Sequence, residues 1–171
     1  MLGLLRDIHL HWRIRSRMSE KRNMPLSWDD IQRVALIVSN KVPLSKNEVD
    51  RFIESTGKYV EVIYIEKDTS KPSFADWTCL TRERINFLGL PKDRILDELS
   101  GKKFDLVINA TPGADRVAAM ISAAMNARMR CSASSKHREA DLIITATTTG
   151  TMGEYLTEVL RYLQMIRARR L

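Results

Sequence analysis

The sequence has few cysteines and no long apolar run, and these absences exclude several classes of protein. Cys79 and Cys131 are its only cysteines, they lie far apart, and neither belongs to a CxxC pair. A disulfide framework or a cysteine-built zinc site is therefore not expected, and a reducing compartment fits best. Charged residues interrupt the apolar positions of residues 2–14, and no run approaches the length of a membrane-spanning helix. We expect a cytoplasmic protein without a transmembrane segment.

The sequence also lacks the motifs of the common nucleotide and catalytic sites. It contains neither GxGxxG after a strand nor GxxxxGK[ST], which excludes a dinucleotide fingerprint and a P-loop. No carboxylate pair is arranged for acid/base work, and His137 is predicted to lie in a solvated loop. His9 and His11 would point to different faces of a helix, so no metal site is expected. No cofactor is expected and no catalytic residue is identified, which favours a protein without enzymatic activity.

The positive charge is concentrated at the two ends of the chain. The formal net charge is +7, and residues 1–25 and 161–171 each carry +4, which leaves −1 for the rest. A neutral body argues against a broad nucleic-acid-binding face, whereas basic ends can contact RNA, acidic lipid or an acidic protein. The arginines predicted to make this contact are Arg6, Arg13, Arg15, Arg17, Arg167, Arg169 and Arg170.

Two parts are expected along the chain, a basic N-terminal helix with its linker (residues 1–25) and a single α/β domain (residues 26–171). Apolar residues between positions 2 and 12 recur at three- and four-residue steps, which places them on one face of a helix. This helix either docks on the body or forms an arm that contacts a membrane surface or RNA.

Residues 26–171 alternate strand-like runs with helical patterns, which is typical of a layered α/β sheet. Strands are predicted at 34–38, 60–65, 104–109, 128–132 and 141–146, with one or two short strands within 76–89. The charged segment 128–132 is predicted to lie at an edge. Helices are predicted from Ser45 to Gly57, over 92–99 and 115–126, and from Thr151 onward. The fold class is α/β, with an open, mostly parallel Rossmann-like sheet of about five or six strands flanked by helices.

Capping signals support two of these helices. Ser45 is followed three residues later by Glu48, and Thr151 is followed three residues later by Glu154. Both pairs match the capping box, in which each side chain accepts a hydrogen bond from the backbone of the other residue.

Small, hydroxyl-bearing or basic residues follow several predicted strands. Ligands of open α/β sheets bind beyond the carboxyl ends of the strands, and free N–H groups at helix N-termini favour anions. The candidate ligand-binding residues are Ser39, Asn40, Lys41, Thr111, Gly113, Thr149, Gly150 and Thr151, and a further loop spans 132–136. Capping and turn formation are the favoured explanation of the same residues, and a ligand pocket is the alternative. Asp115 is interpreted as a helix cap, and Cys131 as a buried structural thiol.

The order of these segments resembles an uncharacterised family of short bacterial α/β proteins, a domain of unknown function. The resemblance is carried by the strand at 104–109, the segments 85–91 and 127–131, and the closing strand and helix at 141–145 and 155–163. It implies a fold but no catalytic residues. The central part is also similar to the acceptor-side half of heptosyltransferase-like glycosyltransferases, although this chain has no room for their donor domain. Similarity of fold alone does not carry function over.

Three functions follow as hypotheses. The favoured one is a non-enzymatic binding or adaptor domain whose basic ends contact an acidic partner, either RNA, the ribosome or a protein. The alternative is a binder or enzyme for a phosphorylated or sugar ligand at the loops after the strands. The third is a subunit of a homodimer joined through the segment 128–132 or the Met-rich helix.

Overall fold

The computed structural model describes residues 26–145 and 151–166, whose core is one six-stranded sheet. The strands lie in the order β3-β2-β1-β4-β5-β6, and every pair of neighbours is parallel. Their bounds are β1 Arg33–Ser39, β2 Tyr59–Glu66, β3 Thr78–Thr81, β4 Lys103–Asn109, β5 Asn126–Ser132 and β6 Leu142–Ile143. The predicted fold class, an open Rossmann-like sheet flanked by helices, is confirmed for this part of the chain.

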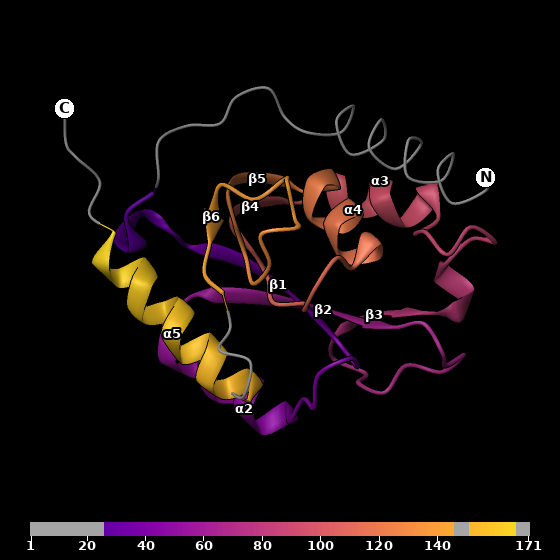
Figure 1. The fold of residues 1–171 in the computed structure, drawn as a ribbon, viewed down its shortest axis with the longest axis horizontal. Helices are drawn as coiled ribbons and strands as arrows, with labels where there is room; N and C mark the ends of the chain where they lie inside the picture. Colours follow the sequence, from indigo (N-terminus) through magenta and orange to yellow (C-terminus); the bar gives the residue numbers. More distant parts are fainter. Residues whose placement is uncertain (1–25, 146–150, 167–171) are drawn as a thin grey trace.

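Four α-helices of the described residues cover the sheet, two on each face (Figure 1). Helices α2 (Lys46–Thr56) and α5 (Met152–Met165) pack on one face, against alternate β1 residues such as Leu36 and Val38. Helices α3 (Asp93–Ser100) and α4 (Arg116–Ala124) pack on the other face, against Ala35 and Ile37. Because both faces are covered, β1 is apolar along nearly its whole length, as the sequence predicts for a central parallel strand.

The two faces also determine where the chain changes direction. Strand β1 is followed by α2 on one face, whereas its neighbour β4 is followed by α4 on the opposite face. Where the connections after two adjacent parallel strands go to opposite faces of the sheet, they leave a topological switch point at its carboxyl edge. In this protein the switch point therefore lies between the ends of β1 and β4.

Several sequence predictions are corrected. The segment 128–132 is not an edge strand, because β5 lies between β4 and β6. Helix α4 ends at Ala124 and not at residue 126, since Met125 is extended and Asn126 begins β5. Strand β6 covers only Leu142–Ile143 of the predicted 141–146, whereas the prediction of one or two short strands within 76–89 is confirmed by β3. The predicted N-terminal helix lies outside the described residues. No helix among the described residues is long and apolar enough to span a membrane.

Arg130 explains why a charged segment can lie inside the sheet. Its side chain is only 1% exposed. Its Nε donates to the Ser122 carbonyl at 3.0 Å, and its Nη2 donates to the Met125 carbonyl at 2.7 Å. The first carbonyl belongs to the last turn of α4 and the second to its C-cap residue, at the end where a helix lacks partners for its C=O groups and where a positive charge is favourable. The guanidinium therefore serves as the C-terminal cap of the helix that precedes its own strand.

We expect Arg130→Met to lower the free energy of unfolding by roughly 2–4 kcal/mol, because two buried carbonyls lose a charged donor. Arg128→Met is the matched control, in the same strand. The Arg128 side chain is 49% exposed and lies 3.5 Å from Asp105, so its loss should cost less than about 1 kcal/mol. Urea unfolding of both variants checks this, and equal destabilisation would contradict the capping role.

Candidate functional site

A buried carboxylate, Asp115, joins three loops at the switch point. Its side chain is fully buried at the start of α4, and its Oδ1 accepts hydrogen bonds from the backbone N–H groups of Val117 and Ala118. Lys41, two residues beyond β1, places its Nζ 2.7 Å from Oδ2. Lys67, directly after β2, places its Nζ 3.5 Å from Oδ1. The predicted capping role of Asp115 is confirmed, and the cap is also the centre of an ion cluster.

The Lys41–Asp115–Lys67 cluster has a net positive charge, although its single carboxylate is ionised. Burial by itself raises the pKa of Asp115, but the Lys41 hydrogen bond, the Lys67 charge and the Ala118 N–H outweigh it, so the pKa lies below its usual range. Asp115 is therefore ionised at neutral pH. Two ammonium groups face this one carboxylate, and their side chains are 49% and 33% exposed. The cluster carries one excess positive charge that solvent can reach.

Side-chain alternation brings further polar groups to the same side of the sheet. Residues two apart in a strand share a face of the sheet. Ser39 therefore lies on the same face as Ile37, and Asn109 on the same face as Val107, which is the face packed against α3 and α4. Ser132 lies two residues after Arg130 in β5 and so shares its face, and the Arg130 side chain hydrogen-bonds to the C-terminal end of α4. All three end their strands on the face covered by α4, whose first turn is capped by Asp115. The cluster and these polar side chains thus lie on one side of one edge of the sheet.

A buried hydrogen-bond network links β4, β5 and the loop after β5. The Asn109 Oδ1 accepts from the backbone N–H of Thr111 at 3.2 Å and from its hydroxyl at 2.7 Å. The Asn109 Nδ2 lies 3.0 Å from the Nδ1 of His137, and the Ser132 Oγ lies 2.7 Å from the same nitrogen. His137 is only 2% exposed, so the prediction of a solvated histidine is wrong. The Asn109 amide and Ser132 hydroxyl make its burial possible.

Two residues of this region, besides the Asp115 carboxylate that pairs with Lys41, each have a buried side-chain atom without a hydrogen-bond partner within the described residues. The two atoms are the Ser39 Oγ and the His137 Nε2, and both residues are at most 2% exposed. Buried polar groups are almost always paired, so each such atom indicates a water or a ligand as its partner. Among residues 26–145 and 151–166 no three His, Cys, Asp or Glu side chains gather as metal ligands. Separately, the Lys41 and Lys67 ammonium groups and the Ser39 hydroxyl are groups that can donate to an anion.

The predicted ligand-binding residues fall into two groups. Ser39, Lys41 and Thr111 lie at the switch point, with Asn40 and Gly113 in the exposed parts of the same loops. The Asn40 N–H donates to the Ile65 carbonyl at 3.2 Å, which ties the start of its loop to β2. Gly113 has a φ of 67°, a conformation that favours glycine. Thr149 and Gly150 lie outside the described residues.

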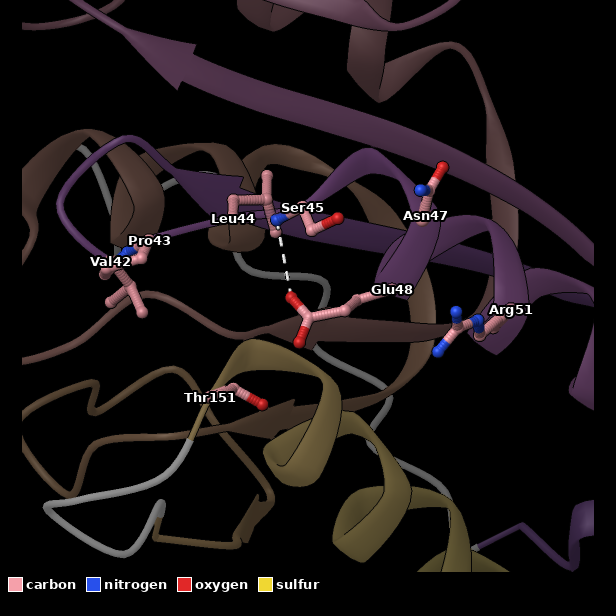
Figure 2. Close-up of a pocket in the computed structure, with 8 residues that line it drawn as sticks. All are labelled: Val42, Pro43, Leu44, Ser45, Asn47, Glu48, Arg51 and Thr151. Carbon is pink, nitrogen blue, oxygen red and sulfur yellow. Dashed lines mark hydrogen bonds between the residues drawn. The ribbon is translucent and has the colours of Figure 1, made fainter.

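Thr151 belongs to a different place, a groove between the N-terminal turns of α2 and α5 (Figure 2). The groove has a volume of about 650 Å³, and Figure 2 shows Glu48 on α2 and Thr151 at the start of α5. Its lining residues are Val42, Pro43, Leu44, Ser45, Asn47, Glu48, Arg51 and Thr151.

Carboxylates already occupy the helix N-termini of this groove. Glu48 Oε2 accepts from the Ser45 N–H at 3.3 Å, and Glu154 Oε2 accepts from the Thr151 N–H at 2.9 Å. The Thr151 hydroxyl in turn accepts from the Glu154 N–H at 3.2 Å. A Cβ added to Gly153 would lie 3.0 Å from Glu48 Oε1, so Glu48 also reaches the first turn of α5. Because negative charge fills the positions that would attract an anion, the groove is a poor phosphate site.

The two cysteines have structural positions. Cys131 is fully buried, and burial raises the pKa of its thiol to about 12. The thiolate is therefore negligible at neutral pH, which confirms the predicted buried structural thiol. Cys79 is also buried and donates to the Phe74 carbonyl at 3.3 Å.

Sequence reasoning missed the residues that complete the switch-point cluster. Lys67 follows β2 directly, and the rule that ligands bind at the carboxyl ends of strands would have pointed to it. Asn109, the last residue of β4, offers the same signal. No local pattern marks His137, because its partners Asn109 and Ser132 come from two neighbouring strands.

Comparison with known protein families yields a match over most of the chain. The model of a family described as "Family of unknown function (DUF6913)" matches residues 6–166. No curated protein and no solved structure matches the chain.

We expect Asp115→Ala to lower the free energy of unfolding by about 1–2 kcal/mol, because α4 loses its N-cap. Asp115→Asn should cost less, since an asparagine still caps but no longer pairs with Lys41. A folded pKa below the ordinary 3.8 means that the carboxylate stabilises the fold above that pH and loses this effect as the pH falls through the folded pKa.

Urea unfolding between pH 3 and 7 measures this dependence. The gap between wild type and Asp115→Asn should be full at neutral pH and should close in acid. Exposed Asp68 is the control, and its replacement by Asn should leave the pH profile unchanged. A gap that stays constant down to the lowest pH would rule out a stabilising ion cluster.

Proposed function

The chain belongs to the family of unknown function (DUF6913), and we propose that it binds a small phosphorylated ligand at the switch point of its sheet. One observation carries the proposal. Lys41 and Lys67 converge on the single carboxylate of Asp115, which leaves an accessible positive charge at the first turn of α4. A phosphate at this place gains from both ammonium groups and from the helix N-terminus.

The unpaired donors support the same ligand. The buried Ser39 Oγ and His137 Nε2 lie on the α4 side of the carboxyl edge and lack partners among the described residues. A phosphate oxygen accepts hydrogen bonds from hydroxyl and imidazole N–H groups, which an apolar ligand cannot do. Together with the two lysines they form a donor-rich site for an oxyanion.

The loop after β1 restricts the size of the ligand. In dinucleotide-binding sheets this loop contains glycines that let the backbone approach a pyrophosphate. Here it runs through Lys41, Val42 and Pro43 to Ser45 without a glycine. The proposal is therefore a single phosphate group on a small molecule, bound without a glycine-rich loop. It is a binding function and includes no catalytic step.

Titration calorimetry with inorganic phosphate and a panel of sugar and nucleoside monophosphates tests the proposal. We expect Lys41→Met to weaken binding at least about tenfold, the effect of losing one charged hydrogen bond. Lys103→Met is the control, because Lys103 is exposed at the amino end of β4, the opposite edge of the sheet. Binding of no phosphorylated compound, or equal loss in both variants, would refute the proposal.

The distribution of charge favours a second candidate, contact of the basic ends with RNA. Residues 1–25 and 161–171 each carry +4 around a body of −1. Most of these residues lie outside the described part of the chain, so the candidate depends on sequence alone. Single-stranded RNA binding would then depend on salt in proportion to the phosphates contacted.

We expect replacement of Arg6, Arg13, Arg15 and Arg17 by glutamine to reduce the slope of log affinity against log salt by up to about 3, at roughly 0.7 per contact. Exposed cations of the body provide the matched control, in which Lys71, Arg82, Lys92 and Lys103 are changed to glutamine. A slope that both variants leave unchanged would refute RNA contact by the N-terminal arginines. A third variant, with Arg167, Arg169 and Arg170 changed, tests the other end.

A further inference from the structure

The side-chain amide of Asn109 has one defined orientation. The backbone N–H of Thr111 can only donate, and it lies 3.2 Å from Oδ1, so this atom is the amide oxygen. The Thr111 hydroxyl donates to the same oxygen at 2.7 Å. The other end of the amide, the Nδ2 group, therefore faces the Nδ1 of His137 at 3.0 Å.

This orientation determines the tautomer of His137. An amide NH₂ group donates and does not accept, so the His137 Nδ1 is the acceptor of this hydrogen bond. In a neutral imidazole the proton then resides on Nε2. Burial lowers the pKa of His137, against the opposing effect of the Asp115 charge, so the ring is neutral at physiological pH. The Ser132 hydroxyl lies 2.7 Å from Nδ1 and 3.3 Å from the Ser134 carbonyl, so its one proton has both atoms within reach as acceptors.

The proton on Nε2 thus forms a buried donor without a partner among the described residues. His137 lies close enough to Asp115 for that carboxylate to act on its pKa. Asn109 and Ser132 hold the ring on the face of the sheet covered by α4. The ring therefore lies at the same edge and on the same face of the sheet as Asp115, with its Nε2–H as a further donor beside the two ammonium groups of Lys41 and Lys67.

We propose that the His137 Nε2–H donates a hydrogen bond to the bound oxyanion, and that Asn109 is the positioning residue that keeps the proton on Nε2. The inference rests on the proposed function and specifies its ligand. The two ammonium groups and the imidazole N–H are donors, which favours a ligand group that only accepts, such as the dianion of a phosphate monoester. Because the imidazole donates while neutral, its contribution persists above the ordinary histidine pKa of about 6.5.

The tautomer is measured by nitrogen-15 NMR of the full chain at pH 7.5, where the long-range couplings of the ring protons distinguish Nε2–H from Nδ1–H. The expected spectrum shows a neutral ring with the proton on Nε2. Titration with inorganic phosphate should then shift the His137 Nε2 resonance with the same Kd that calorimetry gives.

An Nδ1–H tautomer or a charged imidazolium in the free protein would overturn the inference. Phosphate that binds by calorimetry without moving the Nε2 resonance would overturn the inference and leave the proposed function intact. Failure of inorganic phosphate and of every monophosphate to bind would remove both.

Two substitutions separate the two ring nitrogens. An asparagine at 137 offers its amide near the Nδ1 position and can still accept from Asn109, but it has no donor at the Nε2 position. A glutamine places its amide nitrogen near the Nε2 position. We expect His137→Asn to weaken phosphate binding roughly tenfold and His137→Gln to stay within about threefold of wild type. The reverse order would overturn the inference.

Asn109→Asp tests the positioning role by a spectroscopic signature. An aspartate accepts on both oxygens, so the one that faces His137 would require a proton on Nδ1. We expect the variant to lose the neutral Nε2–H tautomer of the wild type, with a proton now on Nδ1. Retention of the neutral Nε2–H form in a folded variant would show that Asn109 does not set the tautomer.

Discussion

The carboxylate of Asp115 is the interaction on which the carboxyl edge of this sheet depends. A fully buried charge is costly unless it is paired and hydrogen-bonded, and Asp115 meets both conditions with two backbone N–H groups and two lysines. These partners come from α4 and from the loops after β1 and β2. The same carboxylate therefore starts a helix, anchors two loops and draws positive charge to the switch point. Its ionisation links the stability of the fold to the character of the site.

The parallel arrangement of the strands turns this local cluster into a site. All strands end at the same edge, and alternation sends Ser39, Asn109 and Ser132 to the face that α4 covers. Each of these polar residues follows an apolar run that belongs to the core. The buried network of Asn109 and His137 is closed on the side of β4 and β5 but open at the His137 Nε2. Among the described residues, the His137 Nδ1 is hydrogen-bonded and its buried Nε2 is not. Leaving Nε2 without a hydrogen-bond partner would cost free energy.

The groove between α2 and α5 and the switch point differ mainly in the sign of their fixed charge. The groove between α2 and α5 is lined by Glu48 (Figure 2), and the carboxylates of Glu48 and Glu154 neutralise the two helix N-termini beside it. At the switch point the capping carboxylate of α4 is itself outnumbered by lysines. Both the groove and the switch point have a helix N-terminus. They differ in the balance between carboxylates and ammonium groups, which is negative in the groove and positive at the switch point.

The sequence by itself determined the class of fold and most element positions, because these depend on residues two to four apart. The branched run of β1, the capping residues Glu48 and Glu154 and the terminating Gly57 were all predicted and are all present. It also identified the loops that carry Ser39, Lys41 and Thr111. Only the tertiary structure decided the interior position of β5, where Arg130 meets the end of α4.

Tertiary contacts alone also decided the burial of His137 and the pairing of Asp115 with Lys41 and Lys67. These contacts join residues that are far apart in the chain and become neighbours only when the strands pair. A local pattern carries no information about them, since the same side chains in isolation would be solvated loop residues. The physical reason is that the charge and protonation of the site depend on its neighbours across the sheet, whereas the elements depend on their neighbours along the chain.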